Sequence, residues 1–260
     1  MQLLVFFVAF LASTFGAIAG FGGGVIIKPT LDALGILPVS TVSFLSGCTA
    51  LGMAVSSLVM QRKSGVKLQI RTSTPLALGA ILGGFAGKTL FELVRNAFQD
   101  ESVLGGIQAI CLTLITTCVF LYVCGRDRLK SFHVEAPMAC VAIGILLGVI
   151  SSFLGIGGGT SNVMILFLCF SMDAKTAAKN SLYIIMFSQT ASILQALATN
   201  TLPEFSFGYL ALMLLGGIGG AMIGAAISRR LSNRGVERIL RTLLAAIIMI
   251  DISNVVKFFC

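Results

Sequence analysis

Two short glycine runs inside long apolar segments contain the residues best suited to bind a ligand. The first reads GFGGG from Gly20 to Gly24, and the second reads GIGGG from Gly155 to Gly159. Such a run breaks a helix in hydrocarbon and frees backbone N–H groups that lipid cannot satisfy. A helix that starts just after the break offers unpaired N–H donors and roughly half a unit of positive charge. The ligand that this arrangement favours is an anion.

Hydroxyl and amide side chains gather around both breaks. They can donate hydrogen bonds to an oxyanion without the cost of burying a charge. Hydrogen bonding between helices explains any one of them equally well, and close helix packing is the alternative role for the glycines. The predicted substrate-binding set is Gly22, Gly23, Gly24, Ser46, Gly157, Gly158, Gly159, Thr160, Ser161, Asn162, Asn180, Ser181 and Gln189.

Few charged residues fall inside the apolar segments. Lys88 and Glu92 are one helical turn apart, and we expect them to form a pair or to reach toward the lipid headgroups. Lys28 and Pro29 are predicted to mark the turn of the first hairpin. Asp251 is a carboxylate well inside a span, which makes it a candidate for proton coupling. A structural partner such as Asn254 or Lys257 explains it as well.

Enzymatic and metal chemistry find no support in the sequence. The sole histidine, His133, lies in a basic loop, and the seven cysteines form no CxxC pair. No nucleophile has a visible base beside it. We therefore expect no catalytic residues, no metal site and no cofactor.

The elements that carry these residues must lie in a lipid bilayer. Of the 260 residues, 57% are hydrophobic and only 11% are charged, and apolar runs long enough to cross a membrane recur along the chain. The net charge of +8 does not indicate a nucleic-acid partner, because 12 of the 18 Lys and Arg residues lie in or just beyond three short loops between apolar runs. We expect one membrane domain over residues 1–260.

Hydropathy divides the chain into eight segments. The first and fifth hold about 35 residues each, where about 20 are enough for one crossing. Glycines interrupt both in the middle, so we predict two hairpins, made either of two short tilted helices or of a re-entrant pair. The predicted segments are 1–36, 38–60, 74–93, 103–124, 136–172, 176–198, 206–227 and 239–257.

Loop charges set the predicted orientation. Basic loops after the second, fourth and seventh segments, around Arg62, Arg126 and Arg229, should face the cytoplasm. The loops at Asp100 and Glu204 are poor in positive charge. With two same-side hairpins, both termini then lie on the non-cytoplasmic side of a cell membrane.

The two halves of the chain repeat one another. The glycine runs are 135 residues apart, and at the same offset Ser46 falls on Ser181. Glycine stripes at every fourth residue, which begin at Gly79 and Gly216, match at an offset of 137 and are predicted to be packing seams. Because the offset places basic loops opposite charge-poor ones, residues 1–125 and 136–260 are predicted to be inverted repeats. The fold class is thus an all-α polytopic membrane protein whose repeats are each a glycine-broken hairpin followed by three transmembrane helices.

The chain resembles a known family in three stretches. These are GFGGG followed by Lys28-Pro29, the GIGGG run at Gly155, and Lys179-Asn180-Ser181-Leu182. They are similar to the TauE/SafE sulfite-exporter family of membrane permeases. The resemblance implies movement of sulfur-containing anions such as sulfite or organosulfonates. Met164 departs from the family pattern, because it stands where the first repeat has Pro29.

Paired glycine breaks in inverted halves predict a secondary transporter of small anions that works by alternating access. The alternative is an anion channel, which needs a continuous path and no alternating gate. The expected partners are a small-molecule anion and the lipid bilayer. Coupling ion, direction of transport and oligomeric state stay open.

Overall fold

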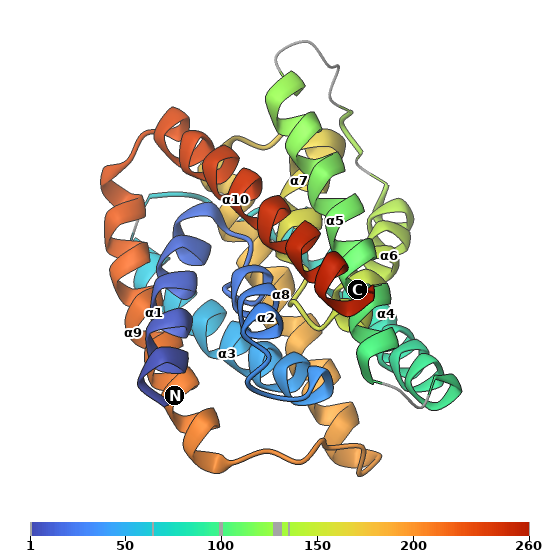
Figure 1. The fold of residues 1–260 in the computed structure, drawn as a ribbon. Helices are drawn as coiled ribbons and strands as arrows, with labels where there is room; N and C mark the ends of the chain where they lie inside the picture. Colours follow the sequence, from blue (N-terminus) through green and yellow to red (C-terminus); the bar gives the residue numbers. More distant parts are fainter. Residues whose placement is uncertain (1, 64, 99–100, 127–131, 135, 260) are drawn as a thin grey trace.

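The computed structural model describes the whole chain except residues 1, 64, 99–100, 127–131, 135 and 260. The described part is helical and has no strand, which confirms the predicted all-α class. Figure 1 shows the helices in chain order. They are α1 Gln2–Ala19, α2 Gly24–Leu34, α3 Val39–Met60, α4 Ile70–Ala97, α5 Glu101–Gly125, α6 Pro137–Leu154, α7 Gly159–Phe170, α8 Ala174–Ala198, α9 Phe207–Arg230 and α10 Asn233–Phe259, with a 3-10 turn at Gln61–Lys63.

Length separates the helices into two kinds. Eight of those in the described residues, all except α2 and α7, are long and apolar enough to cross a membrane. The helices α2 and α7 have 11 and 12 residues, which corresponds to roughly 17 Å and cannot cross about 30 Å of hydrocarbon. The chain is a multi-pass membrane protein with eight candidate spans and two half-length helices.

Both over-long segments are helix pairs that a glycine break separates. Residues 20–23 divide α1 from α2, and residues 155–158 divide α6 from α7. The prediction that Lys28 and Pro29 mark the hairpin's turn is wrong, because both lie inside α2. Lys28 can stay within a buried helix because Asp32, one turn later, pairs with it at 2.7 Å. The chain turns instead at Gly35, whose φ of 63° ends α2.

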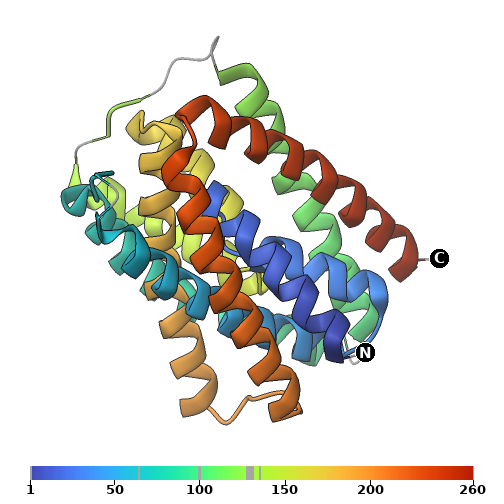
Figure 2. The same ribbon diagram turned by 90° about the vertical axis from the view of Figure 1, so that its left-hand side faces the viewer.

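Glycine stripes hold two helix pairs in backbone contact, as expected for packing seams. The pairs are α1 with α9 and α4 with α6, which lie side by side in Figures 1 and 2. A methyl group on any stripe glycine would press against a backbone carbonyl oxygen of the opposite helix. On α9, Gly216, Gly220 and Gly224 face Phe6, Phe10 and Thr14; on α4, Gly79, Gly83 and Gly87 face Val141, Ile145 and Val149.

The remaining contacts also occur in matched pairs. The helix α3 packs on α9 as α8 packs on α4, and α2 packs on α10 as α7 packs on α5. Each half of the chain therefore completes the other. The inverted orientation of the halves in the membrane stays a prediction, since it depends on where the bilayer lies.

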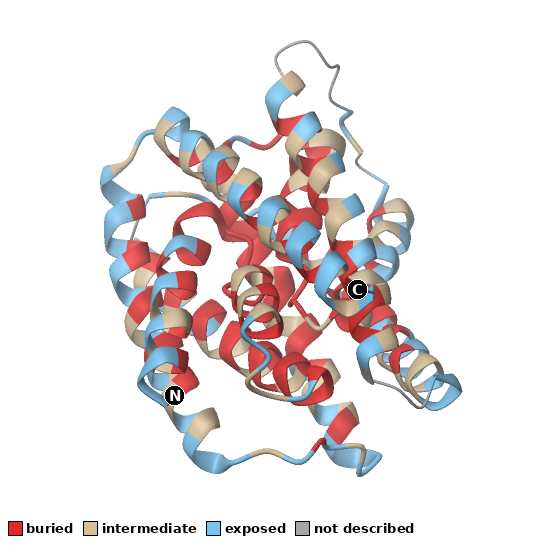
Figure 3. Ribbon diagram, in the orientation of Figure 1, coloured by how far each residue is buried: buried red, intermediate tan, exposed pale blue. Residues whose placement is uncertain are grey.

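Burial follows the arrangement expected in lipid. Buried residues gather in the middle of the bundle in Figure 3, while large apolar side chains such as Leu3, Phe207 and Met249 are exposed on the outer faces of the helices. In water such a surface would aggregate, whereas lipid tails cover it at no cost. The polar residues that matter for function must therefore be sought in the interior.

Candidate functional site

The two glycine breaks touch one another in the centre of the bundle. A methyl group on Gly24, the first residue of α2, would overlap the carbonyl oxygen of Ile156 in the second break. Likewise a methyl group on Gly159, the first residue of α7, would overlap the carbonyl oxygen of Phe21 in the first break. The starts of α2 and α7 are thus brought together at one place, with no room for a side chain at either residue.

The neighbouring helices α3 and α8 press on the two breaks in a matched way. A methyl group on Gly20 would collide with Ala178 of α8, and one on Gly155 would meet the Ser43 side chain of α3. Both glycines have a positive φ, 81° and 65°, that other residues rarely adopt. Close approach and backbone conformation together explain why glycine is needed at the breaks.

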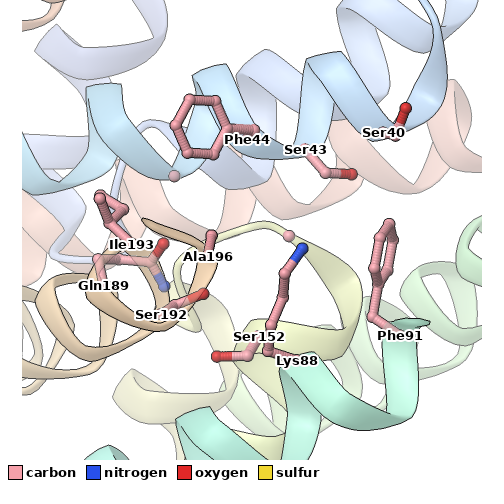
Figure 4. Close-up of a pocket in the computed structure, with 12 residues that line it drawn as sticks. Ser40, Ser43, Phe44, Lys88, Phe91, Ser152, Gln189, Ser192, Ile193 and Ala196 are labelled. Carbon is pink, nitrogen blue, oxygen red and sulfur yellow. The ribbon is translucent and has the colours of Figure 1, made fainter. Parts of the chain in front are cut away.

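A polar-lined cavity opens beside the second break, and Figure 4 shows it in close-up. Four helices line it: α3, α4, α6 and α8. The cavity volume is about 40 Å³, which is room for about three water molecules. The lining residues are Ser40, Ser43, Phe44, Gly47, Lys88, Phe91, Ser152, Gly155, Gln189, Ser192, Ile193 and Ala196.

Lys88 supplies positive charge to this cavity. Its ammonium group lies 2.9 Å from a carboxylate oxygen of Glu92, which confirms the predicted pairing, and 4.6 Å from the centre of the Phe91 ring. Glu92 has a second cation in Arg95, at 3.5 Å. Glu92 therefore keeps a partner if Lys88 turns toward a ligand.

Neutral hydrogen-bonding groups face the same cavity. The hydroxyl groups of Ser43 and Ser152 are buried and have no hydrogen-bond partner in the described residues. Gln189 reaches across from α8, with its amide nitrogen 3.4 Å from the Ser151 hydroxyl and its oxygen against Gly47 of α3. Buried polar groups without partners are uncommon, and they fit a site that a polar ligand or water fills.

Among the predicted substrate-binding residues, Gln189 lines the cavity directly. The others lie around the crossing of the breaks, where Ser46 donates to the Gly24 carbonyl at 3.4 Å and Ser161 to that of Gly158 at 3.0 Å. Thr160, Asn162 and Ser181 are also buried there, and each has an oxygen without a hydrogen-bond partner in the described residues. Gly22, Gly23, Gly157 and Gly158 form the loops of the breaks themselves.

Asn180 occupies a different environment. Its side-chain oxygen accepts hydrogen bonds from the Gln69 backbone at 2.9 Å and from the Ser73 hydroxyl at 2.5 Å. The adjacent Lys179 donates to the carbonyl oxygens of Gln61 and Val66, at 3.0 and 2.7 Å. Both side chains form hydrogen bonds to the connection between α3 and α4 and to the start of α4. These groups are therefore engaged with the protein and not directed at a ligand.

Sequence reasoning missed part of the site. The serines Ser152 and Ser192 were not singled out, although Ser152 lies three residues before the second break. Asp32, which lies outside the cavity, was also missed, because it falls near the end of the predicted segment 1–36, where a charged side chain can reach the headgroups. The spacing of Lys28 and Asp32, one helical turn, was the available signal.

Apolar side chains pack on the side of the breaks opposite the cavity. The cavity uses the first half of α3 and the second half of α8, while the other halves of these helices meet in an apolar cluster. We call this cluster the apolar seal; it consists of Ala17, Ala50, Met53, Ala54, Leu182, Ile185 and Ala221. Lys179 and Arg229, which donates to the Met60 carbonyl, tie the connections beyond it. Apolar packing therefore lies between the cavity and that end of the bundle.

A lipid-facing bundle of long helices, with a polar cavity beside two crossed helix breaks, is typical of a membrane transporter. The model of the family described as Sulfite exporter TauE/SafE matches residues 5–250, and the chain belongs to this family.

Two curated relatives agree with this class. One is the "Probable membrane transporter protein YunE" of Bacillus subtilis (strain 168), which is 24% identical over 261 residues and covers 91% of this chain and 92% of its own length. The other is a "Probable membrane transporter protein" of Haemophilus influenzae (strain ATCC 51907 / DSM 11121 / KW20 / Rd), which is 27% identical over 233 residues and 83% of each chain. No solved structure matches the chain significantly.

Proposed function

We propose that this transporter carries a small anion, specifically a sulfur oxyanion or a small sulfonate, and binds it in the cavity around Lys88. The observation that carries the proposal is the Lys88 ammonium group, which Glu92 pairs from outside the cavity lining, beside the neutral side chains of Ser43, Ser152 and Gln189 next to the second glycine break. One positive charge with hydroxyl and amide donors suits a small oxyanion. The description of the family as a sulfite exporter supports the same substrate class.

Alternating access is the proposed mechanism. A carrier in a state that is open to one side should have a cavity at one end and apolar packing at the other. The cavity and the apolar seal fit this expectation. If the halves 1–125 and 136–260 are inverted repeats, the mirror-image state opens the seal and closes the cavity. By the loop charges, the cavity opens on the non-cytoplasmic side of the cell membrane, where both termini also lie. The starts of α2 and α7 stay in contact and serve as the pivot.

Transport into proteoliposomes tests the function. Labelled sulfite, small sulfonates and small carboxylates are offered to the purified protein, and uptake with saturation and counterflow is expected for a sulfur oxyanion or a sulfonate. Counterflow separates a carrier from an anion channel, because a channel has no step that exchanges one bound substrate for another. If none of these anions is taken up, the proposal is wrong.

The Lys88→Gln variant tests the site. Loss of a charge-assisted hydrogen bond of about 1.5–3 kcal/mol should raise the half-saturating substrate concentration roughly 10- to 100-fold. The matched control is Arg62→Gln, which removes an exposed charge far along the chain from the cavity and should leave uptake unchanged. Unchanged half-saturation in Lys88→Gln would show that the anion binds elsewhere.

A further inference from the structure

A second buried polar cluster lies apart from the cavity, where α10 packs against α2 and α5. Its members are Lys28 and Asp32 on α2, Thr116 on α5, and Asp251 and Asn254 on α10. All five are at least nine-tenths buried: Lys28, Thr116 and Asp251 have no exposed surface, and Asp32 and Asn254 retain 6% and 2%. None of them lines the cavity. We call this set the α2–α10 cluster.

The charges of the α2–α10 cluster do not balance. Lys28 pairs with Asp32 at 2.7 Å, and Asp251 is a second carboxylate that interacts electrostatically with both. Neither carboxylate oxygen of Asp251 makes a well-formed hydrogen bond to a described residue, and the hydroxyl group of Thr116 is close enough to interact with it weakly. One cation therefore faces two carboxylates in the interior.

No other described charge compensates Asp251. The helix α1 carries no titratable side chain, and the ammonium groups of Lys175 and Lys179 on α8 bind backbone carbonyl oxygens elsewhere. On α10 itself, Asn254 donates to the Pro29 carbonyl at 2.8 Å, and Lys257 donates to carbonyl oxygens at the end of α2. The two structural partners expected for Asp251 are thus engaged with α2 instead.

A buried carboxylate without a counter-charge costs several kcal/mol, and the cost disappears when the group binds a proton. Once protonated, Asp251 would also have an O–H group that can donate a hydrogen bond to a neighbouring acceptor. The side-chain oxygen of Asn254 is an acceptor without a donor among the described residues, and it is three positions further on the same helix, within reach of Asp251. The hydroxyl group of Thr116 likewise makes no well-formed hydrogen bond to a described residue.

The helix α2 connects the α2–α10 cluster to the crossing of the breaks. Lys28 follows Gly24 by four residues, one turn of α2 or about 6 Å, and Gly24 is the residue that contacts the Ile156 carbonyl of the other break. A movement of α2 at the second break that also shifts α2 relative to α10 would therefore move Lys28 and Asp32 relative to Asp251. Charge balance in the cluster and the state of the cavity are then linked through one short helix.

We propose that Asp251, held beside the Lys28–Asp32 pair, is a proton-binding site that couples proton movement to transport. The inference rests on the proposed function for its coupling role, whereas the proton site stands on the α2–α10 cluster alone. A proton fits better than a metal cation, because the Lys28 ammonium group already lies in the cluster and repels a second fixed cation.

Infrared difference spectra across a pH titration test the proton site without any substrate. The purified full chain in lipid should show the C=O stretching band of a protonated carboxyl group that Asp251→Asn abolishes. Glu204→Gln, which changes an exposed carboxylate, is the matched control and should retain the band. A band that persists in Asp251→Asn, or no titrating band in the wild type, overturns the site.

Transport in proteoliposomes tests the coupling. A pH gradient should drive accumulation by the wild type, and Asp251→Asn should lose that accumulation while it retains counterflow, since exchange needs no net proton movement. Accumulation driven by sodium instead, or insensitive to the pH gradient, overturns the coupling role. If the wild type carries no tested anion at all, the proposed function fails while the infrared band still decides the proton site.

Discussion

The half-length helices α2 and α7 occupy matching places in the two hairpins but differ in what they bury. Each starts directly after a four-residue glycine break and is held by a long helix of the other half. Residues 135 positions beyond Lys28 and Asp32 are Val163 and Phe167, and both belong to the apolar core. On α10, Asp251 is matched at the same offset by Thr116 on α5. One hairpin thus carries charge where the other carries apolar packing.

This difference assigns two roles to different residues: movement at the crossing to positions that both halves share, and proton binding to positions that only one half has. The shared features, the breaks and their crossing, belong to the proposed pivot, while the features present in one half only belong to the proposed proton site. The breaks themselves also differ slightly: Gly158 has a φ of 79°, whereas Gly23 is helical at −55°. Changes at shared positions should therefore have equal effects in both halves, and changes at unmatched positions unequal ones.

The largest effect is expected at the crossing. Gly24→Ala and Gly159→Ala each place a methyl group onto a carbonyl oxygen of the opposite break, so the crossing must separate. Displacement of about 1 Å at a binding site can cost a factor of about 100, and both variants should lose transport by at least that factor. Uptake rates at equal protein incorporation are the measurement.

Gly208→Ala is the matched control for the crossing, because a methyl group there meets nothing closer than 3.5 Å. It should transport like the wild type. If Gly159→Ala also transports at the wild-type rate, the contact between the breaks plays no part in function.

An intermediate effect, on the free energy of unfolding, is expected at the unmatched positions, and it should differ between the two halves. Lys28→Met leaves two buried carboxylates without their cation and should lower the free energy of unfolding by about 3 kcal/mol. Val163→Ala removes only packing contacts and should cost about 1 kcal/mol. Unfolding in mixed detergent micelles measures both.

The double variant Lys28→Met/Asp32→Leu separates charge imbalance from lost packing. Because it removes the pair as a whole, it should be more stable than Lys28→Met alone. Equal losses for Lys28→Met and Val163→Ala would show that the charges on α2 make no special contribution.

The smallest effects are expected at the ends of the short helices. Lys257 donates to the Asp32 and Ala33 carbonyl oxygens at 3.0 and 2.9 Å, and Arg126 donates to the Met172 carbonyl at 2.9 Å beside the Phe167 ring. These side chains are partly solvated, so Lys257→Ala and Arg126→Ala should each cost less than about 1 kcal/mol in the same unfolding measurement. A much larger loss for one of them would reveal a second unmatched feature.

The sequence by itself determined the membrane class, the two hairpins, the positions of the breaks and the packing seams. These follow from local properties: hydropathy along about 20 residues and the inability of glycine runs to continue a helix in lipid. The Lys88–Glu92 pair was equally predictable, since one helical turn separates its members.

Only the tertiary structure decided which polar residues meet. Helix rotation is set by packing across the whole bundle, so the sequence could not show that Gln189 faces the cavity while Asn180 holds a loop. Nor could it show that Lys28 lies inside α2 and shares a cluster with Asp251, 223 residues away along the chain. The sequence shows which residues are neighbours on one helix, because their spacing decides it. Contact between residues of different helices depends on every side chain that packs between those helices.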